Sequence, residues 1–248
     1  MVPCPKREQN QGMDGFRTVK VLIFWAALLA VGVQGAGVGY QPDTGVGVAP
    51  LRDRSIVESY QSLFGETLSA EQQEGFLKLL RFIKADEEVT DIRWTAYMLA
   101  TVKHETAYTW RPIREFGRGE GRRYGTPDPE LGETYYGRGY VQLTWKENYL
   151  RAGRFLNKDF VRNPDKTLEP ETAYKILSKG MREGWFTGRS LGDYISAGNT
   201  DYVNARRIVN GTDRAESIAS EARKFEMFLR REFAERERVT LVSAADRG

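Results

Sequence analysis

The chain has 248 residues, a formal net charge of +3, one cysteine and one histidine. This length allows one or two domains with a sizeable core. Acidic and basic residues alternate along most of the chain, so the charge pattern gives no indication of a nucleic-acid binder. Because Cys4 is the only cysteine, an internal disulfide and a cysteine-based metal site are excluded.

An apolar run near the N-terminal end has the layout of a secretory signal. Arg17 and Lys20 precede the apolar residues 21–33, and small residues follow at 35–37. The apolar run is too short for a comfortable membrane span. We therefore expect an exported protein, periplasmic or secreted, whose signal is cleaved. The alternative is a protein that stays tethered to the membrane through residues 21–33.

The domain organisation follows from this signal and from the change in composition after it. Residues 1–36 are expected to be the signal or anchor, with Met13 as a second candidate for its start. Residues 37–50 are rich in Gly, Val and Pro and predict a flexible linker. One folded domain is expected over 51–236, followed by a polar, frayed tail over 237–248.

The stretch 92–105 has the pattern of a buried helix that begins after an N-cap at Asp91. Glu105 falls in the last turn, on the face that also carries Met98 and Val102. Burial and the negative end of the helix dipole both disfavour an ionised carboxylate there. A carboxyl group that keeps its proton near neutral pH is what a general acid needs.

Other helices are expected from start and stop signals, and one short strand is expected over 140–144. The helix signals are the capping pairs Ser69/Gln72, Thr144/Glu147 and Asp213/Glu216, the pair Pro170 and Gly184 around one helix, and Asp201 and Asn210-Gly211 around another.

Residues 111–133 are expected to form a long loop, because Pro112 ends the helical pattern and several glycines prevent a regular element. Long loops within compact domains are often functional. The arginines of this loop indicate either a basic lip that faces an anionic polymer or a mobile, solvated loop. They are Arg111, Arg114, Arg118, Arg122 and Arg123.

The presence of a single histidine excludes several kinds of catalytic site. Position 108 is Tyr, so His104 has no partner for the two-histidine zinc motif. No nucleophile-elbow sequence accompanies it, and a structural role is expected for His104. We expect neither a metal nor a cofactor.

The catalytic groups that remain possible are a pair of carboxylates. Glycoside hydrolysis needs one protonated acid and one ionised partner on separate sides of a cleft. Glu115 is the best partner for Glu105, because it follows Pro112 and therefore lies outside the helix. Four other carboxylates stay open as alternatives: Glu120, Asp128, Glu130 and Glu133.

Several runs of residues together point to one known family. They are His104-Glu105-Thr106, Pro112-Ile113-Arg114-Glu115, Tyr136-Gly137-Arg138-Gly139-Tyr140-Val141-Gln142-Leu143-Thr144-Trp145, Asn148-Tyr149 and Arg207-Ile208-Val209-Asn210-Gly211. In this combination the chain resembles glycoside hydrolase family 19 over residues 51–233, especially its bacterial and phage endolysin-like members. The resemblance implies a mainly α-helical, lysozyme-like domain with a small β element and a long active-site loop.

The resemblance also implies a role for each matched residue. Glu105 would be the general acid, Glu115 the general base, and Thr144 the residue that holds the attacking water, besides its expected role as an N-cap. Tyr136 and Trp145 are candidates either for stacking on sugars or for the core. The residues that match binding positions are Gln142, Asn148 and Asn210, whose amides suit N-acetyl and hydroxyl groups, and Arg223, which would steady the carboxylates.

The activity implied by the resemblance is endo-acting, inverting hydrolysis of β-1,4 bonds next to N-acetylated amino sugars in chitin or peptidoglycan, and hence degradation of a cell-wall polymer. A polysaccharide is then the expected partner of a monomer, with no nucleic acid and no stable protein partner. Plant chitinases of the family have a longer segment between the glutamates and carry disulfides. Their absence here favours peptidoglycan or short chitin-like substrates. The alternatives are a catalytically inactive wall-binding protein and a lytic transglycosylase, for which Glu105 alone would suffice.

Overall fold

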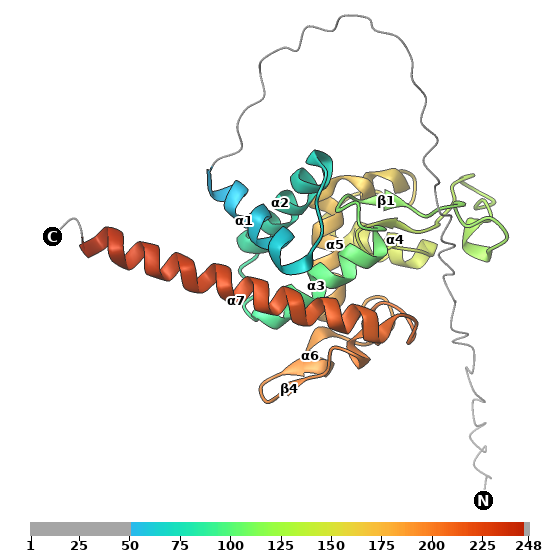
Figure 1. Ribbon diagram of the computed structural model, residues 1–248. Coiled ribbons are helices and arrows are strands. Elements are labelled where there is room, and N and C mark those ends of the chain that lie inside the picture. The colour runs from blue at the N-terminus through green and yellow to red at the C-terminus, as the bar shows by residue number, and fades with distance from the viewer. Residues whose placement is uncertain (1–50, 246–248) are drawn as a thin grey trace, which may run out of the picture.

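The computed structural model describes residues 51–245, so the predicted signal, the predicted linker and the last three residues lie outside the described residues. The described part is mainly helical, with two small antiparallel β pairs (Figure 1). Its elements are α1 (Leu51–Phe64), α2 (Ala70–Ala85), α3 (Ile92–Glu105), β1 (Ile113–Arg114), η1 (Arg123–Gly125), β2 (Arg138–Gly139), α4 (Lys146–Leu156), η2 (Pro164–Leu168), α5 (Pro170–Glu183), α6 (Leu191–Tyr194), β3 (Ile195–Ser196), β4 (Asn199–Thr200), η3 (Asn204–Ile208) and α7 (Ala215–Ala245).

The central helix is α3, and the sequence predicts both of its ends. The carboxylate of Asp91 accepts a hydrogen bond from the backbone N–H of Arg93 at 2.9 Å, which confirms the expected N-cap. Ten of the fourteen residues of α3 are buried. α7 packs along α3 and crosses the domain as its longest helix (Figure 1). The apolar face of α7, which includes Ile218 and Phe225, shares one core with α3.

A buried lysine also ties α3 to its neighbours. Lys103 is 1% exposed, and its Nζ lies 2.8 Å from Glu66 Oε1 and 2.7 Å from Glu221 Oε2. The ammonium group also lies 4.6 Å from the centre of the Phe64 ring. A buried charge is tolerated only when it is paired, so this cluster fixes α3 against α7 and the end of α1.

The helices on either side of α3 begin and end where their signals predict. Ser69 and Gln72 form the complete capping box of α2, with hydrogen bonds of 2.8 and 3.2 Å. Pro170 occupies the first position of α5. Gly184 ends α5 in the left-handed conformation, with φ 71°, which a glycine adopts without strain.

The expected strand over 140–144 is wrong. The strand is β2, which pairs antiparallel with β1, and the chain then reverses so that Arg138 pairs with Leu143. Gln142, in the middle of the predicted strand, has a φ of 51°, which an extended strand does not allow. The alternating pattern of these residues therefore belongs to a tight turn.

Four other segments also depart from the sequence predictions. The expected helix from Asp201 is only the short η3, and the side chain of Asp201 caps its start through the N–H of Asn204. α1 and the hairpin of β3 and β4 carry no clear signal in the sequence. α7 continues to Ala245, into the expected frayed tail, because the Glu, Arg, Leu and Ala residues of this region favour helix.

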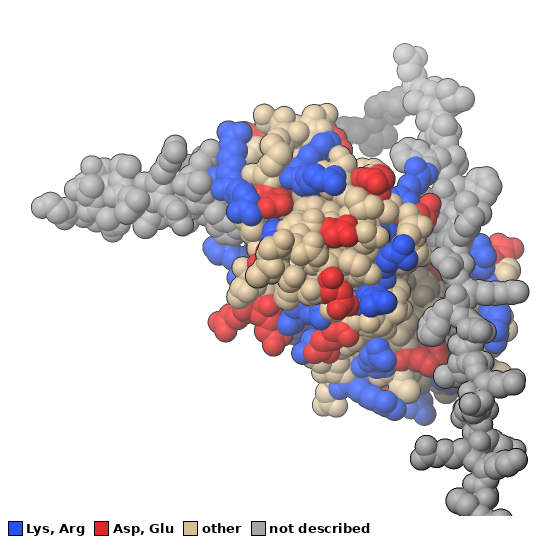
Figure 2. All heavy atoms as spheres, turned by 90° about the horizontal axis from the view of Figure 1, so that it is seen from below, with Lys and Arg blue, Asp and Glu red and all other residues tan. Residues whose placement is uncertain are grey.

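The outer surface carries both signs of charge. Figure 2 shows Lys and Arg interspersed with Asp and Glu on one face of the molecule, as the alternating sequence predicts. None of the helices within residues 51–245 is long and apolar enough to cross a membrane.

Candidate active site

Glu105 is the last residue of α3, and its side chain is buried. Its Oε1 accepts a hydrogen bond from Nη1 of Arg206 at 2.5 Å. The predicted burial of Glu105 beside Met98 and Val102 is confirmed, and η3 in addition brings a guanidinium to the carboxylate. Arg206 was missed by the sequence analysis, although it directly precedes the run 207–211 that was singled out.

Arg206 is itself fixed from a second side. It is 2% exposed, and its Nε donates to the backbone oxygen of Asp213 at 3.0 Å. A buried ion pair is rigid when its remaining polar atoms are also paired. The position of Glu105 is thus set jointly by α3 and by η3, and no hydrogen bond to its Oε2 is formed within the described residues.

The connection from Glu105 to Glu115 is tightly folded. Ala107, Tyr108 and Trp110 have φ values of 48°, 65° and 60°, a region that residues other than glycine seldom occupy. Such conformations persist only where the surrounding structure imposes them. Here the constraint is Trp110, which is fully buried among the aromatic rings of the core.

Gly75 of α2 makes this anchor possible. A Cβ atom at Gly75 would lie 2.6 Å from the backbone oxygen of Trp110, which is closer than atoms can approach. The segment after α3 therefore lies directly against the backbone of α2. The core thus fixes the chain five residues before Glu115.

Glu115 follows β1 and is half-buried. Its Oε1 accepts a hydrogen bond from the hydroxyl of Tyr124 at 2.8 Å, and its Oε2 accepts one from the N–H of Gly137 at 2.9 Å. The backbone N–H of Glu115 also donates to the oxygen of Gly137 at 2.7 Å. Burial raises the pKa of Tyr124, and the hydrogen bond to Glu115 raises it further, so Tyr124 stays a protonated donor.

Gln142 is brought next to Glu115 by the turn after β2. A Cβ atom on Gly137 would lie 2.9 Å from Gln142 Oε1 and 3.3 Å from Glu115 Cβ, so only glycine fits between these side chains. Nε2 of Gln142 donates to the backbone oxygens of Ile113 and Gly139, each at 3.2 Å. Gln142 therefore holds β1 to the turn, and the binding role that the resemblance implies for it remains a prediction.

Thr144 does not cap α4, contrary to the sequence prediction. α4 begins at Lys146, its N-cap residue is Trp145 with φ 73°, and no side chain makes a cap hydrogen bond there. The left-handed residue at 145 moves the helix start one position beyond Thr144. The backbone oxygen of Thr144 accepts a hydrogen bond from Nδ2 of Asn148 at 2.9 Å, so these two predicted residues do lie together.

The two predicted residues from the C-terminal part differ in position. Asn210 is half-buried, and its N–H donates to the backbone oxygen of Arg206 at 3.0 Å, which links it to the Glu105 side of the site. Its Oδ1 accepts a hydrogen bond from the N–H of Gly211 at 2.8 Å. Arg223 is exposed on α7, and the arginine that contacts Glu105 is Arg206.

The alternative carboxylates have other surroundings. Asp128 forms an ion pair with Lys146 at 2.6 Å and accepts hydrogen bonds from two backbone N–H groups of its own turn. Glu120 and Glu130 are exposed, and Glu133 lines a separate pocket. Of these loop carboxylates, Glu115 is the one that both a tyrosine hydroxyl and the backbone N–H of Gly137 orient.

Aromatic side chains flank Glu115 and Tyr124. Trp145 is 36% exposed, and its ring meets the ring of Tyr124 edge-on at 5.4 Å. Phe116, which directly follows Glu115, is 73% exposed. Tyr136 is buried beneath the guanidinium of Arg138, whose Cζ lies 3.6 Å from the ring centre, so Trp145 and Phe116 are the rings open to a ligand.

No group of three or more His, Cys, Asp or Glu side chains that could hold a metal ion occurs within the described residues. Two glutamates stand on separate elements of a mainly helical domain, one buried and one half-buried and oriented by hydrogen bonds. Such an arrangement of carboxylates is typical of glycoside hydrolases.

Comparison with known proteins agrees with this class. Residues 95–176, which include Glu105, Glu115 and Thr144, match the family model described as Chitinase class I. An endochitinase of Arabidopsis thaliana is 29% identical over 164 residues, which are 61% of this chain and 53% of that protein. Chitinase 3 of Oryza sativa subsp. japonica is 30% identical over 159 residues, 53% of this chain and 49% of that protein.

Among solved structures, chitinase C from Streptomyces griseus HUT6037 is 21% identical, with a TM-score of 0.46 over 76% of this chain and 83% of that chain. The chain spans about half the length of the curated relatives it matches. Its residues 95–176 resemble glycoside hydrolase family 19. The resemblance to this family and the mainly α-helical fold that the sequence indicates are therefore confirmed.

Proposed function

We propose that this protein hydrolyses β-1,4 bonds next to N-acetylated amino sugars within a polysaccharide chain, with inversion at the reacting carbon. The observation that carries this proposal is the difference between the two glutamates. Glu105 is buried beside Arg206, whereas Glu115 is half-buried and accepts two hydrogen bonds. An inverting glycosidase needs two carboxyl groups in such unequal settings.

Glu105 is the proposed general acid. Arg206 contacts its Oε1 only, so Oε2 is the oxygen that would carry the proton to the leaving sugar. The ion pair fixes the direction of this oxygen, and positioning of a proton donor is a large part of acid catalysis. The bond between the sugar and its linking oxygen breaks as this proton is delivered.

Glu115 is the proposed general base. Tyr124 and Gly137 donate to its two oxygens, and these hydrogen bonds fix the direction of the carboxylate that would take a proton from the attacking water. Thr144 is the proposed holder of the attacking water, and its hydroxyl is not used as a helix cap. Water would attack the face of the sugar opposite the leaving oxygen.

The proposed substrate is chitin or peptidoglycan, and wall degradation by an exported protein is part of the proposal. The relatives in Arabidopsis and rice are named as chitinases, which supports a polymer of N-acetylated amino sugars. Asn148 and Asn210 are proposed to bind the N-acetyl and hydroxyl groups. Trp145 and Phe116 are proposed to stack on sugar rings, because both are exposed beside Glu115.

The anomeric form of the fresh product tests the mechanism. We expect proton NMR to show the α-anomer first, because a single displacement at a β-linkage inverts the reacting carbon. A β-anomer would indicate retention, and a 1,6-anhydro sugar would indicate the transglycosylase alternative. Binding of both polymers without any product would indicate the inactive wall-binding alternative.

A further inference from the structure

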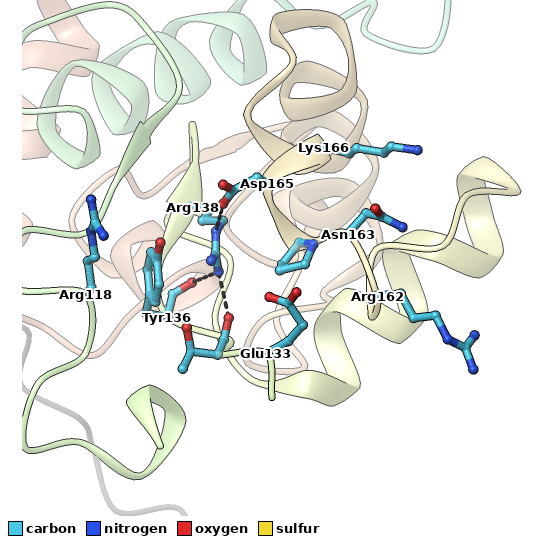
Figure 3. A pocket seen from close by; sticks show the side chains of 10 residues that line it. Arg118, Glu133, Tyr136, Arg138, Arg162, Asn163, Asp165 and Lys166 are labelled. Atoms are coloured by element: carbon cyan, nitrogen blue, oxygen red, sulfur yellow. Dashed lines mark hydrogen bonds and ion pairs between the residues drawn. The ribbon is translucent and has the colours of Figure 1, made fainter. Parts of the chain in front are cut away.

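A pocket of about 620 Å³ lies beside the candidate active site, and neither Glu105, Glu115 nor Thr144 lines it (Figure 3). It is bounded by the loop after Glu115, by the segment around β2 and by η2. The lining residues carry four cations and two carboxylates. They are Arg118, Glu133, Thr134, Tyr136, Arg138, Arg162, Asn163, Pro164, Asp165 and Lys166.

The floor of this pocket is Arg138, which is 3% exposed. Its Nε donates to Asp165 Oδ1 at 2.7 Å, and its Nη1 donates to the backbone oxygen of Thr134 at 2.9 Å and to the hydroxyl of Tyr149 at 3.0 Å. Within the described residues, Nη2 makes no hydrogen bond and is not among the buried unpaired atoms. The guanidinium of Arg138 is therefore held in place, and its Nη2 can donate a hydrogen bond to a ligand in the pocket.

The rim adds two further cations, Arg118 and Lys166. Arg118 and Lys166 are exposed, and neither side chain forms an ion pair within the part of the chain that the structure describes. Figure 3 places Arg118 on one side of Tyr136 and Lys166 on the other side of the pocket. Arg162, by contrast, pairs with Asp159 at 3.0 Å.

One carboxylate of the pocket is already occupied. Asp165 binds Arg138 through Oδ1 and Arg114 through Oδ2, each at 2.7 Å. Glu133 is the carboxylate that stays available. The pocket thus offers guanidinium and ammonium donors together with one acceptor, a set that suits a ligand with carboxylates and an amino group.

This pocket is connected to Glu115 through the backbone. The N–H of Arg118 donates to the backbone oxygen of Glu115 at 3.0 Å, so the turn that begins at Glu115 carries Arg118 to the rim. Tyr136 and Arg138 flank Gly137, whose N–H holds the carboxylate of Glu115. Because side chains alternate along an extended segment, the pocket and Glu115 lie on its two opposite faces.

We infer that the pocket binds the carboxylate-bearing peptide that a peptidoglycan strand carries beside its cleaved bond. Chitin is uncharged when fully acetylated and offers nothing for Arg118, Arg138 and Lys166 to bind. A peptide stem offers carboxylates to these donors and, where it contains a diamino acid, an amino group to Glu133. This inference rests on the proposed function and selects peptidoglycan as the substrate.

The first test compares two forms of one polymer. The protein is given peptidoglycan strands with intact peptide stems and the same strands after an amidase has removed the stems, and kcat/KM is measured from new reducing ends. We expect the intact strands to be favoured by roughly tenfold, the size of about one charged hydrogen bond. In the Arg118→Ala/Lys166→Ala double variant this ratio should fall to about one.

The matched control for the first test is Arg154→Ala/Lys84→Ala. It removes one arginine and one lysine that are exposed on α4 and α2, away from the pocket. We expect this variant to keep the ratio of the unmodified protein. A ratio of about one in the unmodified protein, or an unchanged ratio in the pocket double variant, would overturn the inference.

The second test separates this inference from the proposed function. A soluble N-acetylmuramoyl dipeptide is titrated into the Glu105→Gln variant by calorimetry, with an N-acetylglucosamine oligomer as the comparison ligand. We expect the muramoyl dipeptide to bind, and the pocket double substitution to weaken its binding by roughly tenfold while the oligomer is unaffected. If the unmodified protein cleaves neither polymer but this pattern holds, the proposed function fails and the pocket assignment stands. No binding of the dipeptide would overturn the pocket assignment itself.

Discussion

Glu105 and Glu115 are ten residues apart in the sequence, and the protein holds the two carboxylates by different kinds of contact. Glu105 lies at the end of a buried helix and pairs with a side chain 101 residues away, Arg206. Glu115 lies on a loop at the edge of a two-residue strand, and its partners are a tyrosine hydroxyl and a backbone N–H. The first contact is part of the core, and the second belongs to a small surface unit.

Because the contacts differ, substitutions at the two positions should differ in their effect on the free energy of unfolding. Removing one partner of a buried ion pair costs about 3–5 kcal/mol, because the other charge remains buried. Removing one hydrogen bond to a carboxylate costs at most about 1.5–3 kcal/mol, and at a half-exposed site water replaces part of it. Changes around Glu105 should therefore affect folding and activity together, whereas changes around Glu115 should affect activity with little cost in stability.

The largest expected effect is that of Glu105→Gln. The amide keeps an oxygen that can accept from Arg206, but it has no acidic proton for the leaving sugar. We expect kcat to fall by about 10²–10⁴-fold, the usual contribution of a general acid. Circular dichroism should still show a folded, helical protein. Near-normal turnover on either polymer would exclude Glu105 as the acid.

Glu115→Gln should reduce kcat by a similar or smaller factor, about 10²–10³-fold, because the amide is no base for the attacking water. Its oxygen can still accept one of the two existing hydrogen bonds, so the thermal midpoint of unfolding should change little. Tyr124→Phe is the matched control, since it removes one donor and keeps the carboxylate. We expect only a severalfold loss for Tyr124→Phe, which corresponds to about 1 kcal/mol.

The choice of carboxylate in the loop can be checked in the same assay. If Glu115→Gln stays active while a substitution of Glu120, Asp128, Glu130 or Glu133 abolishes turnover, the base is misassigned. Asp128 needs a stability control in that comparison, because its ion pair with Lys146 closes the loop.

Arg206→Met is the variant that tests the buried contact itself. It leaves Glu105 without its ion-pair partner, and we expect a loss of about 3–5 kcal/mol in the free energy of unfolding. Chemical denaturation measures this loss. Arg207→Met is the control, because Arg207 is the next residue in the sequence but its side chain is exposed. Equal stability of the two variants would show that the ion pair does not hold Glu105 in place.

The sequence alone predicts those parts of the fold that depend on neighbouring residues. The N-cap of α3, the capping box of α2, and Pro170 and Gly184 around α5 are all local signals, and each is confirmed. The burial of Glu105 in the last turn of its helix is predicted by the same reasoning, because this helix is strongly periodic. The position of Glu115 after Pro112 favours it as the second carboxylate, and the family resemblance implies its role as base.

The remainder of the site depends on contacts that no local pattern contains. Arg206 meets Glu105 only after η3 has folded against the end of α3. The sequence predicts a strand where the turn after β2 lies, because its polar and apolar residues alternate. A glutamine gives no sign of the positive φ that Gln142 adopts. The same applies to Trp145, whose left-handed φ removes Thr144 from the cap position.

The smallest expected effect concerns His104, which precedes Glu105 on α3. Burial lowers the pKa of His104 below 6.5, and the neighbouring carboxylate of Glu105 opposes this shift. The imidazole of the unfolded chain therefore binds a proton more readily than that of the folded protein. For this reason the free energy of unfolding decreases as the pH falls below 6.5, whereas above pH 6.5 His104 does not change it. His104→Gln should remove that part of the pH dependence.

Because the chain has a single histidine, its titration can be followed directly and compared between variants of the two glutamates. Proton NMR of the imidazole C–H resonance should give a midpoint below 6.5 in the unmodified protein. Glu105→Gln should lower the midpoint further, because it removes the charge that raises the pKa of His104. Glu115→Gln should leave it unchanged, since Glu115 is not among the groups that influence His104. Equal shifts in the two variants would show that both carboxylates share one electrostatic environment, contrary to the separation that their contacts indicate.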